Sequence, residues 1–182
     1  MTSTIRIIAI YGTAAGLVVA VPMVWLMLTL TQETAPDNGA VYGYLTMILA
    51  LTAVFLGVKH YRDKVQGGVV RFMPALMVGL GISAVASLIY AAGWEISLAF
   101  SGFDFGAVSS KMAIEAARAR GASETEIEQV IAQTVAFTRM YASPLYRFPI
   151  TFVEMFPIGV AISAISAALL RNSRFLPARA GA

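Results

Sequence analysis

The sequence contains no cysteine and a single histidine, His60. The absence of cysteine excludes disulfide bonds, a thiolate nucleophile and cysteine-bound zinc. One histidine, next to a hydrophobic run, does not make the ligand cluster of a transition-metal site, and we expect it at a membrane boundary. We therefore predict neither a bound metal nor a cofactor.

Charge is also scarce. Charged residues make up 13% of the chain and hydrophobic residues 58%, whereas soluble domains carry about 25% charged residues. So much apolar surface calls for a lipid bilayer as its solvent. The net charge of +3 is too small to indicate a nucleic-acid-binding surface.

Four hydrophobic runs are long enough to span a bilayer, at residues 7–30, 41–58, 73–100 and 148–170. The first run exceeds the apolar core of a signal peptide, so we expect it to be retained. Pro149 falls in the first turn of the fourth run, where proline is tolerated, and Pro157 lies well inside it. These patterns predict an all-α fold, an integral membrane four-helix bundle forming a single membrane domain over residues 1–182.

The segment 104–146 differs from the runs because it is mixed in charge and carries helix punctuation. Gly121 is placed to end one helix, Ser123 and Glu126 fit a capping box that starts another, and Ser143-Pro144 ends that second helix. We predict a helical hairpin outside the membrane between the third and fourth spans. The basic tail, 171–182, is expected to lack order.

The placement of lysine and arginine indicates the orientation. If both termini and the 59–71 loop share one side, that side holds 8 basic residues and the other holds 5. The loop at 32–39 carries only acids. By the positive-inside rule, both termini are cytoplasmic and the 104–146 insert is outside. We expect a multi-pass protein of the bacterial cytoplasmic (inner) membrane.

Small residues recur at helical spacing in every span. In the third run Gly79, Ser83, Ser87 and Ala91 are four residues apart, and the next step reaches Glu95. Such stripes allow helix backbones to approach closely in lipid. They fit packing within one chain, with the interface of a homo-oligomer as the alternative.

Two carboxylates, Glu95 and Glu154, lie inside apolar runs, where a charge costs at least roughly 2.5 kcal/mol. Both are predicted in the outer half of the membrane. Arg147 lies two turns above Glu154 on the same face, and Pro157 frees a backbone carbonyl beside it. Two interpretations stay open: a polar clamp between the third and fourth spans, or a binding site for an ion, proton or ligand. The predicted polar site comprises Glu95, Glu154, Arg147, Tyr90, Trp94 and Pro157.

A second concentration of polar residues follows the second span. It consists of Tyr61, Arg62 and Asp63, followed by the glycine pair Gly67 and Gly68. This is either a tight turn anchored to lipid headgroups or a turn that binds a partner or phosphate. It lacks the longer glycine pattern and Lys-Ser/Thr of a phosphate loop.

Three stretches of the chain form distinctive patterns. They are Gly43-Tyr44 with Met47, Ala50, Val54-Phe55 and Gly57; Tyr61-Arg62-Asp63 with Gly67-Gly68, Phe72, Gly79, Tyr90 and Trp94; and Pro144 to Phe148 with Thr151-Phe152, Glu154 and Phe156-Pro157. In these stretches the chain resembles a bacterial membrane protein family known as domain of unknown function 4199, and the similarity covers almost its whole length. The resemblance implies four spans and an extracytoplasmic helical insert, and it implies no activity.

The sequence shows neither a nucleophile with a base nor a histidine paired with an acid, so we expect no catalytic residues and no enzyme activity. The first hypothesis is a structural or accessory protein that binds a membrane or periplasmic partner. The alternative is a small oligomeric transporter of an ion, proton or solute that uses Glu95 and Glu154.

Overall fold

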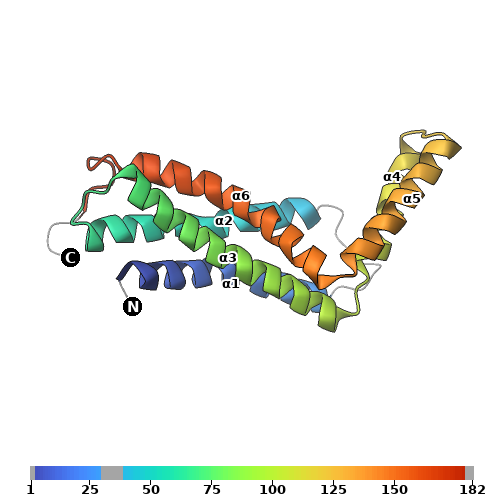
Figure 1. Cartoon of the computed structure of the whole chain (residues 1–182), viewed down its shortest axis with the longest axis horizontal. Coiled ribbons are helices and arrows are strands. Elements are labelled where there is room, and N and C mark those ends of the chain that lie inside the picture. Colours follow the sequence, from blue (N-terminus) through green and yellow to red (C-terminus); the bar gives the residue numbers. More distant parts are fainter. Residues whose placement is uncertain (1–2, 30–38, 179–182) are drawn as a thin grey trace.

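The computed structural model describes residues 3–29 and 39–178, and every regular element in this part of the chain is a helix (Figure 1). Four helices are long and apolar enough to cross a membrane, and a hairpin of two others lies between the third and fourth of them. The predicted all-α bundle is thereby confirmed, while the acidic residues of the 32–38 loop and Arg179 lie outside the described residues. The helices are α1 (Ser3–Thr29), α2 (Gly39–His60) with the π-helical turn η1 (Tyr61–Val65), α3 (Phe72–Ser101), α4 (Phe105–Ala119), α5 (Glu124–Tyr141) and α6 (Pro144–Leu170).

Two helices extend further than their hydrophobic runs. The second continues through η1, where the backbone N–H of Gln66 donates to the carbonyl of Tyr61, five residues earlier. The fourth begins at Pro144 rather than at 148, because proline is well suited to the first position of a helix. Pro149 consequently lies inside α6 instead of in its first turn.

The four long helices form an elongated bundle in which α3 packs along both α1 and α6 (Figure 1). Helix α2 contacts α1, α3 and α6. The beginning of α1, the turn η1 and the end of α6 lie at one end of the bundle, and the α4–α5 hairpin projects from the other. We refer to these as the η1 end and the hairpin end.

The small residues of α3 and α6 meet each other directly. A Cβ added to Gly79 would lie 2.8 Å from the Cβ of Ser163, and one added to Gly159 would lie 2.5 Å from the Cβ of Ser83. The two serine hydroxyls are 3.2 Å apart. Each glycine therefore accommodates the serine of the opposite helix, and the small-residue stripe is used here for packing within the chain.

The same arrangement holds α1 against α3. A Cβ added to Gly12 would lie 2.6 Å from the Cβ of Val85, and one added to Gly16 would lie 2.7 Å from the Cβ of Ile89. By contrast, an added Cβ on Gly43 would have nothing within 4 Å.

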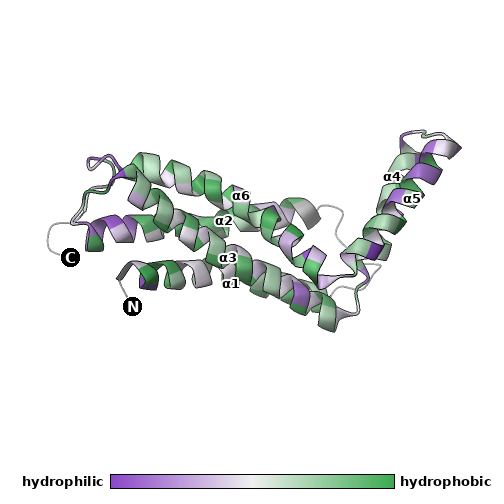
Figure 2. Cartoon of the chain, viewed as in Figure 1, coloured by the Kyte–Doolittle hydropathy of each residue, from purple (hydrophilic) through white to green (hydrophobic). Residues whose placement is uncertain are grey.

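The outer surface of the bundle is predominantly apolar. Figure 2 shows hydrophobic residues along the four long helices, with polar residues concentrated at the η1 end and on the hairpin. In the most apolar stretches of these helices only a third or slightly more of the residues are buried. Large side chains such as Trp25 and Phe100 are more than two-thirds exposed. A surface of this kind fits contact with lipid tails.

The hairpin has the punctuation that the sequence predicts. Gly121, between its helices, has a φ of +75°, a left-handed conformation that suits glycine. Ser123 and Glu126 form both hydrogen bonds of a capping box at the beginning of α5. A Cβ on Gly106 would lie 2.6 Å from the Cγ2 of Thr138, so α4 and α5 are in close contact near their base.

The tail differs from the sequence prediction. Residues 171–178 form turns against the η1 end instead of a segment without order. Backbone carbonyls of Phe175 and Leu176 accept hydrogen bonds from Arg62, and the Phe175 ring meets Phe55 edge-on. Residues 171–178 are held there because Arg62, a buried side chain far away in the sequence, binds the backbone of Phe175 and Leu176.

Candidate functional site

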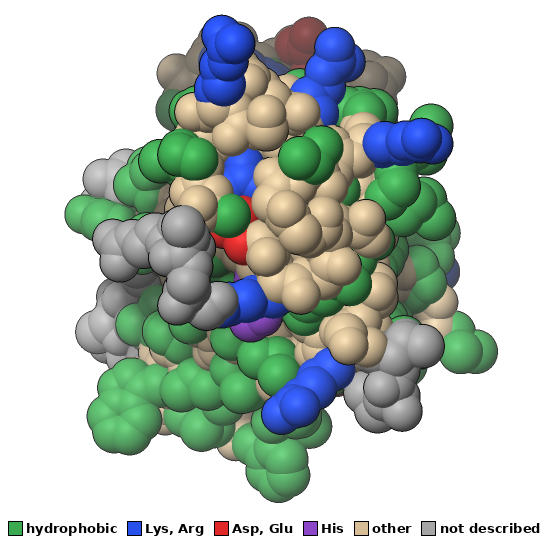
Figure 3. Space-filling model, turned by 90° about the vertical axis from the view of Figure 1, so that its left-hand side faces the viewer, with side chains coloured by type: hydrophobic (Ala, Val, Ile, Leu, Met, Phe, Trp, Pro, Cys, Tyr) green, Lys and Arg blue, Asp and Glu red, His purple; other side chains and the backbone are tan. Residues whose placement is uncertain are grey.

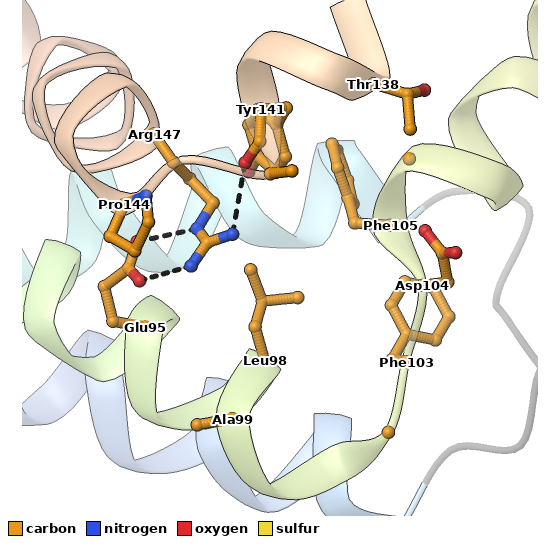
Figure 4. A pocket seen from close by; sticks show the side chains of 13 residues that line it. Glu95, Leu98, Ala99, Phe103, Asp104, Phe105, Thr138, Tyr141, Pro144 and Arg147 are labelled. Carbon is orange, nitrogen blue, oxygen red and sulfur yellow. Dashed lines mark hydrogen bonds and ion pairs between the residues drawn. The ribbon is translucent and has the colours of Figure 1, made fainter. Parts of the chain in front are cut away.

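The hairpin end contains a bidentate ion pair between α3 and α6. Arg147 Nε donates to Glu95 Oε1 at 2.8 Å, and Arg147 Nη2 donates to Glu95 Oε2 at 2.5 Å (Figure 4). The third guanidinium nitrogen, Nη1, donates to the backbone carbonyl of Tyr141 at 3.1 Å. Both side chains are mostly buried, with 14% of Arg147 and 23% of Glu95 exposed. All three guanidinium nitrogens thus bind protein oxygens, which fits a clamp.

This ion pair also joins the hairpin to the bundle. Tyr141 is the last residue of α5, Arg147 lies in the first turn of α6, and Glu95 lies near the end of α3. The guanidinium carbon is 5.7 Å from the centre of the Tyr141 ring, within range of a cation–π interaction. One arginine therefore fixes the end of the hairpin, the beginning of α6 and the end of α3.

Aromatic side chains strengthen the same junction. Trp94 Nε1 donates a hydrogen bond to the Tyr141 hydroxyl at 2.7 Å. The Phe105 ring, at the beginning of α4, meets Trp94 edge-on and lies beside Tyr141, with centroid distances of 5.4 and 5.0 Å. Burial raises the pKa of the Tyr141 phenol, although the bond from Trp94 lowers it in part. Tyr141 therefore stays a neutral phenol at physiological pH.

A pocket of about 630 Å³ lies between the hairpin base and the ends of α3 and α6 (Figure 4). Its volume is in the range of small-molecule sites. Of its charged groups, Glu95 is bound by Arg147, and Asp104 accepts a hydrogen bond from the backbone N–H of Ala107 as the N-cap of α4. The pocket is lined by both acids and Arg147, and by the rings of Phe103, Phe105 and Tyr141.

Glu154 is not part of this junction. Its carboxylate accepts a hydrogen bond from the Tyr90 hydroxyl at 3.3 Å, and its side chain is exposed on the surface of the bundle. It borders a second hollow of about 390 Å³ with Pro149, Ile150 and Val153. The six residues predicted as one polar site therefore form two groups. Glu95, Arg147 and Trp94 meet at the junction, while Tyr90 and Glu154 pair deeper along the helices, with Pro157 in the next turn.

The register of α3 against α6 explains this division. The two helices are antiparallel, and Gly79 faces Ser163 while Ser83 faces Gly159. Continuing by four residues on each helix brings Glu95 opposite Arg147. Glu154 is seven residues, about 10 Å, beyond Arg147 and so lies at the level of Tyr90.

The five residues of the predicted Tyr61–Gly68 turn do lie together. Tyr61, Arg62 and Asp63 belong to η1, and Gly67 and Gly68 follow with φ values of +66° and +93°. Arg62 is completely buried, and its Nε donates to Asp63 Oδ1 at 2.7 Å.

Sequence reasoning placed Tyr141 near the polar region, but it did not identify Phe105 or the hydrogen bond between Trp94 and Tyr141, because both depend on how the hairpin folds back. The pairing of Glu95 with Arg147, by contrast, is indicated by the spacing of residues in the sequence. Arg147 lies on the same four-residue repeat of α6 as Gly159 and Ser163, as Glu95 does on that of α3. Among residues 3–29 and 39–178, no group of three or more histidine, aspartate or glutamate side chains is placed to hold a metal ion.

Comparisons with known proteins give one result. A family model described as a protein of unknown function (DUF4199) matches residues 10–172. No curated protein and no solved structure matches the chain.

Proposed function

Because the chain belongs to the DUF4199 family, whose description names no function, we propose its role from the geometry: an accessory membrane protein that presents the α4–α5 hairpin to a protein partner outside the membrane. The observation that carries this proposal is the Glu95–Arg147 junction. The charge pair joins α3 to α6, and the same Arg147 donates to the Tyr141 carbonyl and so holds the end of the polar hairpin against the apolar bundle. A rigid attachment of this kind suits a surface that must keep one orientation in order to bind a second protein.

The distribution of charge supports an orientation with both termini in the cytoplasm. Figure 3 views the η1 end, where lysine and arginine side chains surround an acidic one and apolar side chains border them. Positive charge on one side of the spans favours the cytoplasmic side, and we propose a bacterial inner membrane as the location. The described basic residues at this end are Arg6, Lys59, Arg62, Lys64, Arg71, Arg171 and Arg174.

The surface best suited to a partner is one face of α5. Ile131 and Val135 are one turn apart and have exposed fractions of 40% and 46%. Glu128 and Arg139 lie on the same face of the helix at its two ends and are exposed. An apolar centre between charged residues resembles the composition of protein interfaces.

The test is photo-crosslinking in native membranes. A photoreactive amino acid placed at Ile131 or Val135 is expected to give one discrete adduct with a second protein. The same group at Arg118, an exposed position on α4, serves as the matched control and should not give it. The adduct at position 135 should disappear when Ile131→Glu is added. Adducts only with lipid or with a second copy of the chain would contradict the proposal.

The arrangement favours this role over the alternative of a small oligomeric transporter. Both carboxylate oxygens of Glu95 bind Arg147, and the α3–α6 seam is filled by glycine and serine. Flux through proteoliposomes should therefore equal that of protein-free liposomes, and Glu95→Gln and Glu154→Gln should not alter it. A flux that either substitution abolishes would favour transport instead.

A further inference from the structure

Arg62 occupies an unusual position at the η1 end. Arg62 is completely buried. Its guanidinium binds the backbone of the tail, which lies more than one hundred residues away in the sequence. Nη1 donates to the Phe175 carbonyl at 2.9 Å, and Nη2 donates to the Leu176 carbonyl at 2.5 Å. Two adjacent oxygens therefore face the two terminal nitrogens of the guanidinium.

The charges around this contact do not balance. Asp63 accepts from both Arg62 Nε and Lys59 Nζ, so one carboxylate is shared between two cations. The remaining ligands of Arg62 are the two neutral carbonyls of the tail. A guanidinium is especially suited to bidentate pairing with a carboxylate or phosphate, in which two parallel hydrogen bonds join groups of opposite charge. An oxyanion in place of the two carbonyls would also supply the missing negative charge.

We propose that Arg62 forms a phosphate-binding seat and that the backbone of Phe175 and Leu176 occupies this seat as an internal plug. The ligand is a phosphate oxyanion, with two oxygens placed as the two carbonyl oxygens are. It comes either from the headgroup of an anionic lipid or from free phosphate in solution. Binding of the anion and docking of the tail exclude each other.

Residues 171–178 are all exposed, so this described part of the tail packs only lightly against the bundle. The Phe175 ring meets Phe55 edge-on, with a centroid distance of 6.4 Å, and a Cβ added to Gly68 would lie 3.4 Å from the Cβ of Ala178. The side chains of Phe175 and Leu176 are 36% and 48% exposed. Leu176 also has a φ of +47°, a left-handed conformation that a leucine rarely adopts. Replacing this segment at Arg62 therefore costs little packing and relieves backbone strain.

The experiment measures amide hydrogen exchange in the tail of the full chain in lipid nanodiscs. Three conditions are compared at equal ionic strength: phosphatidylcholine alone, phosphatidylcholine mixed with phosphatidylglycerol, and phosphatidylcholine with inorganic phosphate in the buffer. We expect the amides of residues 174–176 and 178 to exchange about tenfold faster when the anion is present, which corresponds to about 1.4 kcal/mol. Acceleration by phosphatidylglycerol alone identifies the source as a lipid headgroup, and acceleration by inorganic phosphate identifies it as free phosphate.

Three variants separate the seat from general surface charge. Arg62→Gln should show fast tail exchange in all three conditions and no response to either anion. Lys64→Gln removes an exposed cation from the same turn and should keep the full response. Phe175→Ala leaves the guanidinium intact and loosens the plug, so it should respond at a lower anion concentration, which tests the seat even if Arg62→Gln fails to fold. The proposal is overturned if neither anion changes tail exchange, or if Lys64→Gln removes the response.

Discussion

The hydroxyl oxygens of Ser83 and Ser163 lie 3.2 Å apart where α3 and α6 cross, and each serine packs against a glycine of the opposite helix. Three steps of four residues along the same register lead from Ser83 to Glu95 and from Gly159 back to Arg147. The tight seam and the ion pair are therefore parts of one helix pairing. A shift of α3 against α6 by one turn would break both.

The first prediction concerns the close contact between α3 and α6. Gly159→Ala places a methyl group 2.5 Å from the Cβ of Ser83, so the helices must separate. We expect the free energy of unfolding to fall by about 1–3 kcal/mol, as for other overpacked cores. Gly43→Ala is the matched control, because its added Cβ meets nothing within 4 Å. Unfolding in mixed micelles, followed by circular dichroism, should separate the two variants, and equal effects would contradict the assigned seam.

The second prediction concerns the ion pair. Glu95→Gln or Arg147→Gln leaves a mostly buried charge without its partner. We expect each to lower the free energy of unfolding by about 1–3 kcal/mol, less than for a fully buried pair because both groups keep some solvent contact. The double variant should lose less than the sum of the two.

A distance measurement tests whether the same pair orients the hairpin. Since the chain contains no cysteine, spin labels can be placed through Thr125→Cys on α5 and Phe100→Cys at the end of α3. Both positions are exposed. The distribution of label distances should be narrow in the parent chain and broad after Arg147→Gln. An unchanged distribution would show that the hairpin is held without the ion pair.

The third prediction concerns the Trp94–Tyr141 hydrogen bond. Tyr141→Phe removes the acceptor of the indole N–H and should lower the free energy of unfolding by about 1 kcal/mol. The emission maximum of Trp94 should shift, which is best recorded after Trp25→Phe removes the other tryptophan of the chain. Tyr146→Phe, at an exposed tyrosine, should leave the emission unchanged.

The fourth prediction concerns the capping box of the hairpin. Ser123→Ala removes the side-chain bond to the backbone N–H of Glu126 and should destabilise α5 by about 1 kcal/mol. Amide exchange should rise in the first turn of α5 and not in the four long helices. Thr125→Ala, at an exposed neighbouring position, should change this exchange far less.

The fifth prediction is a pH dependence at the same place. Hydrogen bonds from the Ser123 backbone N–H and hydroxyl lower the pKa of Glu126 below its ordinary value of 4.5. Because the folded pKa is the lower one, the ionised carboxylate stabilises α5 above pH 4.5, and this stabilisation is lost as the pH falls through the lowered pKa. NMR titration of the Glu126 carboxyl should give a value below 4.5, and a value at or above 4.5 would contradict the capping geometry.

The spans were predictable from the sequence because a run of apolar residues is a local signal. The hairpin was predictable for the same reason, since Gly121, Ser123 and Glu126 act within a few residues of one another. The sequence also predicted that Glu95 and Arg147 lie in one polar region, because both are expected at a similar depth near the outer side of the membrane. Their pairing, however, depends on the register of α3 against α6. Only the contacts of Gly79 and Ser83 with α6 establish that register.

The turns of residues 171–178 were not predicted, because they depend on a contact with a residue that is distant in the sequence. Residues 171–178 contain several polar and basic residues, a composition that locally indicates disorder. The deciding group is Arg62, at a position where a lipid-anchoring cation is the ordinary expectation. A completely buried arginine that binds two backbone carbonyls leaves no trace in local composition.

The attachment of the hairpin at its base, through Arg147, Trp94 and Phe105, has a mechanical consequence. Helix α5 has 18 residues, which gives it a length of about 27 Å. With Arg147 at its base as the fulcrum, a rotation of about 10° there displaces the far end by about 5 Å. A small change of orientation at the Arg147–Tyr141 contact is thus converted into a large displacement near Gly121.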